Sequence, residues 1–138
     1  MPKTPVRIAI DTNLWVSHIR NQFRSHLNSV LEQDEMDLIT SPELTRELFT
    51  VLQRPKFSDK IGSQSLLLFR ELYEQSTLSV EIISTVNDCR DPKDNHLLAL
   101  ALDADLDFLL TGDNDLLVLD PYGKTRILKI ADYLAGKF

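Results

Sequence analysis

The sequence is poor in the residues that build disulfides, zinc clusters and glycine-rich loops. Its 138 residues include one cysteine, Cys89, and only four glycines. A single cysteine excludes an internal disulfide and a zinc site made of cysteines. No GxGxxG or Walker sequence is present, so a glycine-rich phosphate loop is not expected. There is also no HExxH and no GxSxG, which argues against zinc proteases and α/β-hydrolases.

Long apolar runs are also missing. The longest, residues 97–102, is far shorter than a bilayer span, and the start MPKTPVRIAID lacks the apolar core of a signal peptide. We therefore expect a cytoplasmic protein with no membrane contact. The length predicts one domain over residues 1–138, and 43% hydrophobic with 26% charged residues is typical of a globular chain.

An excess of positive charge is the third absence. There are 15 Lys and Arg against 21 Asp and Glu, a net charge of -6 with a pI near 5.0. Such a balance argues against binding nucleic acid through bulk positive charge. The surplus is local, however. Residues 85–120 hold nine acids against Arg90 and Lys93, whereas the remainder has a net charge of +1. Bound cations would offset the charge of that segment.

Short β-rich runs alternate with segments of helical spacing. This alternation predicts an α/β fold with a parallel sheet and helices on both faces. The expected strands are residues 6–10, 38–40, 80–83, 108–110 and 126–128. The expected helices are residues 41–53, 65–75, 94–104 and 130–135, with one or two more in 12–34.

Acidic residues follow two of these strands. Asp11 follows the first strand directly, and Asp113 lies just beyond residues 108–110. Asp94 opens a helix, and Glu47 flanks the buried stripe of another. Each of these residues also has a purely structural interpretation. Asp94 can cap a helix, Asp113 can form a turn, and Glu47 can pair with a basic residue at the surface. Taken together, four acids without a fixed basic partner would repel one another, and a hard divalent cation resolves that conflict.

Four stretches resemble the conserved blocks of PIN domains. They occur in order, span residues 8 to about 134, and are most similar to the VapC-type toxin components of prokaryotic toxin–antitoxin systems. The blocks are Ile8-Ala9-Ile10-Asp11-Thr12-Asn13, Ser41-Pro42-Glu43-Leu44 through Glu47-Leu48 with Arg54-Pro55-Lys56-Phe57, Asp91-Pro92-Lys93-Asp94-Asn95 with Leu97-Leu98-Ala99-Leu100-Ala101, and Leu110-Thr111-Gly112-Asp113 with Asp115-Leu116-Leu117.

The resemblance implies a five-stranded PIN-like domain acting as an endoribonuclease with one or two Mg²⁺ or Mn²⁺ ions. It implies an RNA substrate, a cognate antitoxin protein and a homodimer as partners. Carried over by position, the catalytic acids are Asp11, Glu47, Asp94 and Asp113, with Glu43 as the competitor of Glu47. The implied metal ligands are Asp11, Asp94, Asp113 and Asp115, and the implied supporting residues are Thr12, Asn13, Thr111 and Asp91.

Basic residues outside the acidic segment are candidate RNA contacts, with a solvated surface as the alternative interpretation. They are Arg20, Arg24, Arg46, Arg54 and Lys56. Two other function classes stay open. One is a PIN-like module that binds RNA or protein with little or no catalysis. The other is a phosphatase with Asp11 as nucleophile, which is disfavoured because Asn13 stands where its second acid is usual.

Overall fold

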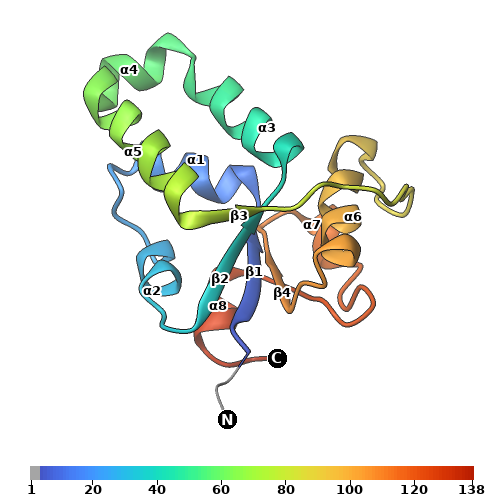
Figure 1. The fold of residues 1–138 in the computed structure, drawn as a ribbon. Coiled ribbons are helices and arrows are strands. Elements are labelled where there is room, and N and C mark those ends of the chain that lie inside the picture. Colours follow the sequence, from blue (N-terminus) through green and yellow to red (C-terminus); the bar gives the residue numbers. More distant parts are fainter. Residues whose placement is uncertain (1–3) are drawn as a thin grey trace.

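A five-stranded parallel sheet runs through the molecule, as Figure 1 shows. The structure is a computed structural model that describes residues 4–138. Its strands are β1 (Val6–Ile10), β2 (Met36–Thr40), β3 (Thr77–Ser79), β4 (Phe108–Leu110) and β5 (Arg126–Leu128), in the spatial order β3-β2-β1-β4-β5. The predicted α/β class and the parallel sheet are confirmed. The chain adds strands on one side of β1 and then on the other, so the order reverses between β1 and β4, where α/β proteins bind ligands.

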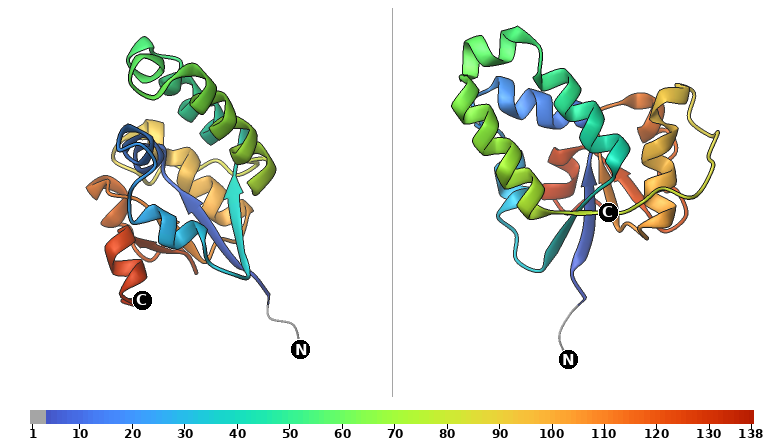
Figure 2. Two further views of the ribbon diagram at one scale, coloured as in Figure 1. Left: turned by 90° about the vertical axis from the view of Figure 1, so that its left-hand side faces the viewer. Right: turned by 45° about the horizontal axis from the view of Figure 1, so that its top comes forward.

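Helices form the connections between the strands. They are α1 (Thr12–Arg20), α2 (Leu27–Leu31), α3 (Pro42–Leu52), α4 (Pro55–Ile61), α5 (Ser63–Ser76), the 3₁₀ turn η1 (Pro92–Asp94), α6 (Asn95–Asp103), α7 (Asn114–Leu117) and α8 (Ile130–Leu134). Figure 2 shows α6 apart from the layer that contains α1, α3 and α5. Within residues 4–138, no helix combines the length and apolarity needed to cross a membrane.

The core has two parts because successive strand residues point to opposite faces of the sheet. Ile8 and Ile10 pack in the cluster that contains α1, α3 and α5 side chains. Ala9 packs in the cluster formed with α6 and α7. The other inner strands alternate in the same way, so the sheet is buried on both faces, as expected for a parallel sheet.

The third strand is not where the sequence predicts it. The expected strand at residues 80–83 is wrong, because β3 ends at Ser79 and the chain then leaves the sheet. Val80 and Ile82 nevertheless pack against the α6 side of the core, while Ile83 is exposed. The backbone N–H groups of Ile83 and Ser84 donate to Asp103 of α6. The alternating pattern is therefore real, but it fits a segment lying against a helix and not a paired strand.

Two short helices have no counterpart in the prediction. One is α4, which begins with Pro55 at its first turn and buries Phe57. The other is α7, whose N-cap is Asp113. Residues 12–34 form two helices, which decides between the two alternatives for that stretch.

Candidate active site

Asp11 and Thr111 mark the carboxyl ends of the two central strands. The backbone N–H of Asp11 donates to the carbonyl of Leu110, so β1 and β4 are still paired where the acid begins. The Thr111 hydroxyl donates to Asp11 Oδ2 over 2.7 Å and accepts from the backbone N–H of Asp113 over 3.0 Å. Thr111 is fully buried and Asp11 is 3% exposed. One threonine thus holds the first acid and the loop of the second acid in a fixed relation.

Asp94 and Asp113 approach from two other segments. Asp94 ends η1 and begins α6, and its side chain is buried. Asp113 caps α7, where its carboxylate accepts the backbone N–H of Asp115 over 2.9 Å. The Asp113 side chain lies close enough to Asp94 to raise the pKa of the Asp94 carboxyl.

The protonation of these acids reflects burial and mutual repulsion. The pKa of Asp94 is raised to about 7, chiefly by burial and in addition by the neighbouring side chain of Asp113 and the charge of Asp11. Burial also raises the pKa of Asp11, as do the charges of Glu47 and Asp113, against the lowering effect of the Thr111 hydrogen bond. Acids that raise one another's pKa values form a site where a positive charge is strongly favoured.

Glu47 is the fourth acid at this site. It projects from α3, and His96 Nε2 of α6 lies 3.0 Å from its Oε2. That hydrogen bond lowers the pKa of the Glu47 carboxyl. The nearby Thr12 side chain also lowers the pKa of Glu47, although the buried Thr12 hydroxyl has no hydrogen-bond partner among residues 4–138.

These residues fit a hard divalent cation by their chemistry. All the donors are oxygens, and none of Asp11, Asp94 or Asp113 forms an ion pair with a basic residue among residues 4–138. In the same residues, no three His, Cys, Asp or Glu side chains are placed as ligands of one ion. The acids therefore supply suitable oxygen donors without a basic partner, although their side chains are not arranged around one ion in this structure.

Asp115 and Asp91 are more peripheral. Arg90 Nε donates to Asp115 Oδ1 over 2.8 Å, so the charge of Asp115 is already paired. Asp91 accepts the backbone N–H of Lys93 and lies 3.6 Å from its ammonium group. Asn13 is exposed and reaches Asp11 only through its backbone N–H.

Comparison with family models gives a match to the PIN domain over residues 7–115. The match covers most of the chain and contains all four acids. The chain belongs to the PIN domain family. PIN domains are generally nuclease modules, typically hydrolases that act on nucleic acids, and they generally use divalent metals. A comparison with curated proteins found no match.

Two of the candidate RNA contacts of this PIN domain lie against the same aromatic ring. Arg20 lies at the far end of α1 from Asp11, and its guanidinium is 6.0 Å from the Phe57 ring centre. The ammonium of Lys56 lies over the same ring at 5.3 Å. Arg24, Arg46 and Arg54 are exposed, in the loop after α1, on α3 and at the start of α4 respectively.

Two basic partners of the acids are not predicted from the sequence. His96 pairs with Glu47, and Arg90 pairs with Asp115. A usable signal exists for His96, which interrupts the start of the apolar α6 two residues after Asp94. The Arg90 contact joins residues 25 positions apart through a loop, and no local spacing indicates it.

Proposed function

We propose that this PIN domain is an endoribonuclease that hydrolyses phosphodiester bonds of RNA with Mg²⁺ or Mn²⁺. The observation that carries the proposal is the convergence of Asp11, Asp94 and Asp113 without a basic counterpart. A site of this kind attracts a divalent cation and, through it, a phosphate group. The same acids without a cation would repel the substrate.

The three aspartates would hold the metal, with Glu47 completing the site. When bound, the metal supplies a water of lowered pKa and neutralises the charge that develops on the phosphate. Thr111 orients the Asp11 carboxylate by its hydrogen bond. Glu47, held by His96, would orient the attacking water. Asp115 is a weaker candidate ligand because Arg90 neutralises it, and Asp91 is a supporting acid only.

We assign the domain to the toxin role of a toxin–antitoxin pair, in the cytoplasm, with a cognate antitoxin and a second copy of the chain as partners. The support is the resemblance of the four sequence blocks to VapC-type toxins. The measurement is growth of a bacterial culture after induced expression. Wild-type protein should arrest growth and Asp11→Asn should not, and equal growth of both cultures contradicts the toxin role.

The biochemical test is cleavage of single-stranded RNA by purified protein with Mg²⁺, with Mn²⁺ and with chelator. We expect products with 5′-phosphate and 3′-hydroxyl ends in the presence of either metal and no cleavage with chelator. Asp11→Asn should keep its fold, measured by circular dichroism, and lose activity. RNA binding without cleavage by wild-type protein would identify a binding module instead. Turnover of a chromogenic phosphate monoester but not of RNA would identify a phosphatase.

A further inference from the structure

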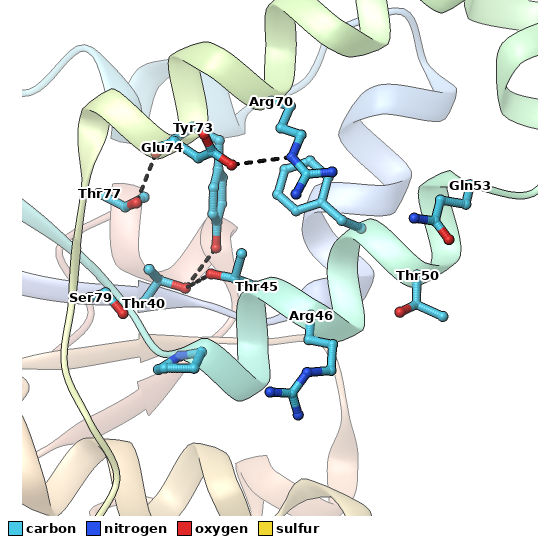
Figure 3. Close-up of a pocket in the computed structure, with 12 residues that line it drawn as sticks. Thr40, Thr45, Arg46, Thr50, Gln53, Arg70, Tyr73, Glu74, Thr77 and Ser79 are labelled. Atoms are coloured by element: carbon cyan, nitrogen blue, oxygen red, sulfur yellow. Dashed lines mark hydrogen bonds and ion pairs between the residues drawn. The ribbon is translucent and has the colours of Figure 1, made fainter.

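A cavity of about 450 Å³ lies between α3, α5 and the ends of β2 and β3. Figure 3 shows the twelve residues that line it, of which all but Pro42 and Phe49 carry polar side chains. Ligand cavities of this size are common in proteins, but most are lined by apolar side chains with only a few polar groups. Most of the exposed lining surface is nevertheless apolar, so the cavity suits a ligand that has both an apolar face and hydrogen-bonding groups.

One wall of the cavity is fixed by internal hydrogen bonds. The Thr40 hydroxyl lies 2.7 Å from Tyr73 Oη and 3.1 Å from the Thr45 hydroxyl. Thr40 and Tyr73 are both buried, so this network joins the end of β2 to α5 and sets the shape of the floor. On the same helix as Tyr73, Arg70 is paired with Glu74 and lies over the Phe49 ring.

The wall of the cavity formed by α3 carries polar side chains that are available to a ligand. Arg46 and Thr50 lie on α3 and Gln53 caps its C-terminal end, and within residues 4–138 no side-chain hydrogen bond or ion pair is found for these three residues. They offer a guanidinium, a hydroxyl and an amide. A guanidinium binds phosphate, and hydroxyl and amide groups bind ribose hydroxyls and base edges. The free groups therefore match the parts of one nucleotide.

The cavity and the candidate active site share helix α3 and neighbouring strand ends. Thr40 is the last residue of β2, and Asp11 directly follows the last residue of the neighbouring β1. Arg46 precedes Glu47 on α3, so the same helix presents one residue to the cavity and the next to the acids. A strand whose phosphate lies at the acids can therefore place a neighbouring nucleotide in the cavity.

We propose that this cavity binds one nucleotide of the RNA strand next to the scissile phosphate, which makes it a substrate subsite. The proposal rests on the proposed ribonuclease function. Arg46 holds the flanking phosphate, while Thr50 and Gln53 contact the ribose and base. Of the five candidate RNA contacts in the sequence, the structure favours Arg46 for this role, because it alone lines the cavity.

The test combines a protein variant that fills the cavity with RNA substrates that lack one base. Thr50→Trp fills the cavity from an exposed helix position, and Gln64→Trp is the matched control at an exposed position of α5 outside it. Cleavage in Mg²⁺ is measured with an RNA oligonucleotide and with copies that have one abasic nucleotide at each position around the cleavage site. We expect Thr50→Trp to raise the half-saturating RNA concentration about tenfold, and Gln64→Trp to leave it unchanged.

The abasic copies distinguish a subsite from a general disturbance. At one position next to the cleavage site, loss of the base should weaken wild-type binding about tenfold and add nothing in Thr50→Trp, because the two changes remove the same contact. Equal effects of the abasic nucleotide in both proteins overturn the subsite and leave the nuclease function intact. Absence of cleavage by wild-type protein overturns the nuclease function and, with it, the subsite.

A second pair of variants covers the case in which the tryptophan disturbs α3. Arg46→Gln should raise the half-saturating RNA concentration and reduce its dependence on salt, because one phosphate contact is lost. Lys60→Gln removes the same charge from an exposed position on α4 and should change neither. Identical behaviour of the two variants overturns the role of Arg46.

Discussion

The two ends of the sheet carry acidic residues in opposite ways. At the amino ends of β4 and β5, Asp107 accepts the backbone N–H of Arg7, and Asp120 forms two hydrogen bonds with the Arg126 guanidinium. At the carboxyl ends, Asp11 and Asp94 have no basic partner among the described residues and repel each other. The pKa shifts follow this division. The Arg126 hydrogen bond lowers the pKa of Asp120, whereas burial raises that of Asp94.

The comparison separates acids that raise the stability of the fold from acids that lower it. A carboxylate paired with a guanidinium adds to stability, whereas a buried carboxylate without a partner subtracts from it. Most of the acids concerned belong to the same acidic segment, residues 85–120, so net charge does not distinguish them. Their partners do, and the unpaired group is the one at the edge where parallel sheets bind ligands.

The largest effect should come from exchanging one acid at each end of β4. Asp113→Asn removes a proposed metal ligand and should lower RNA cleavage at least about 100-fold, because charge stabilisation at the phosphate is lost. Asp107→Asn, just before the same strand, should leave the cleavage rate within about twofold. Rates are measured under single-turnover conditions at saturating Mg²⁺. Equal loss in both variants would remove the distinction between the two ends.

The next effect is a dependence of stability on pH in metal-free protein. Between the ordinary value of 3.8 and about 7, folded Asp94 holds a proton that the unfolded chain has released. The free energy of unfolding should therefore fall as the pH rises through this window and level off above it. Asp94→Asn cannot titrate, so its melting temperature, measured with chelator from pH 4.5 to 8, should show a flatter profile. Parallel profiles of the two proteins would contradict the raised pKa.

Asp120→Asn tests the opposite pKa shift, at the amino end of the sheet. The variant loses charge-assisted bonds to Arg126 and should lower the free energy of unfolding at pH 7 by about 1–2 kcal/mol, a fall of about 4–8 °C in Tm. The pKa of Asp120 is lowered on folding, so its contribution is present above the ordinary value of 3.8 and is lost below it. The two proteins should therefore converge in Tm at acidic pH. An unchanged Tm at pH 7 speaks against the pairing.

The smallest effect should come from Lys124→Ala. This half-exposed lysine lies 3.1 Å from Asp105 and 3.4 Å from Asp107. Exposed pairs contribute little, so we expect a loss of at most about 0.5 kcal/mol in chemical unfolding, and less at high salt. A loss above about 1 kcal/mol would show that the amino-end acids depend on this lysine more than on backbone N–H groups.

The sequence predicts well the features that depend on local order. Asp11 and Asp113 each follow an apolar strand, and parallel strands align their carboxyl ends, so the meeting of these acids is foreseeable. The partner of each acid cannot be predicted in the same way. Whether a carboxylate meets Arg90, His96 or another acid depends on how loops and helices pack, and similar spacing accompanies both outcomes. The misplaced third strand has the same cause, because an alternating pattern reports burial of one side and not the neighbour that buries it.

The hydrogen bond from Thr111 to Asp11 closes a loop of 100 residues. Contacts between residues so far apart in the chain form slowly, because the intervening chain loses conformational entropy before the contact contributes any stabilisation. During synthesis β1 emerges early, but its partner β4 follows only after most of the chain has been made. The acids thus meet late in folding, and a chain interrupted before residue 113 carries no assembled site.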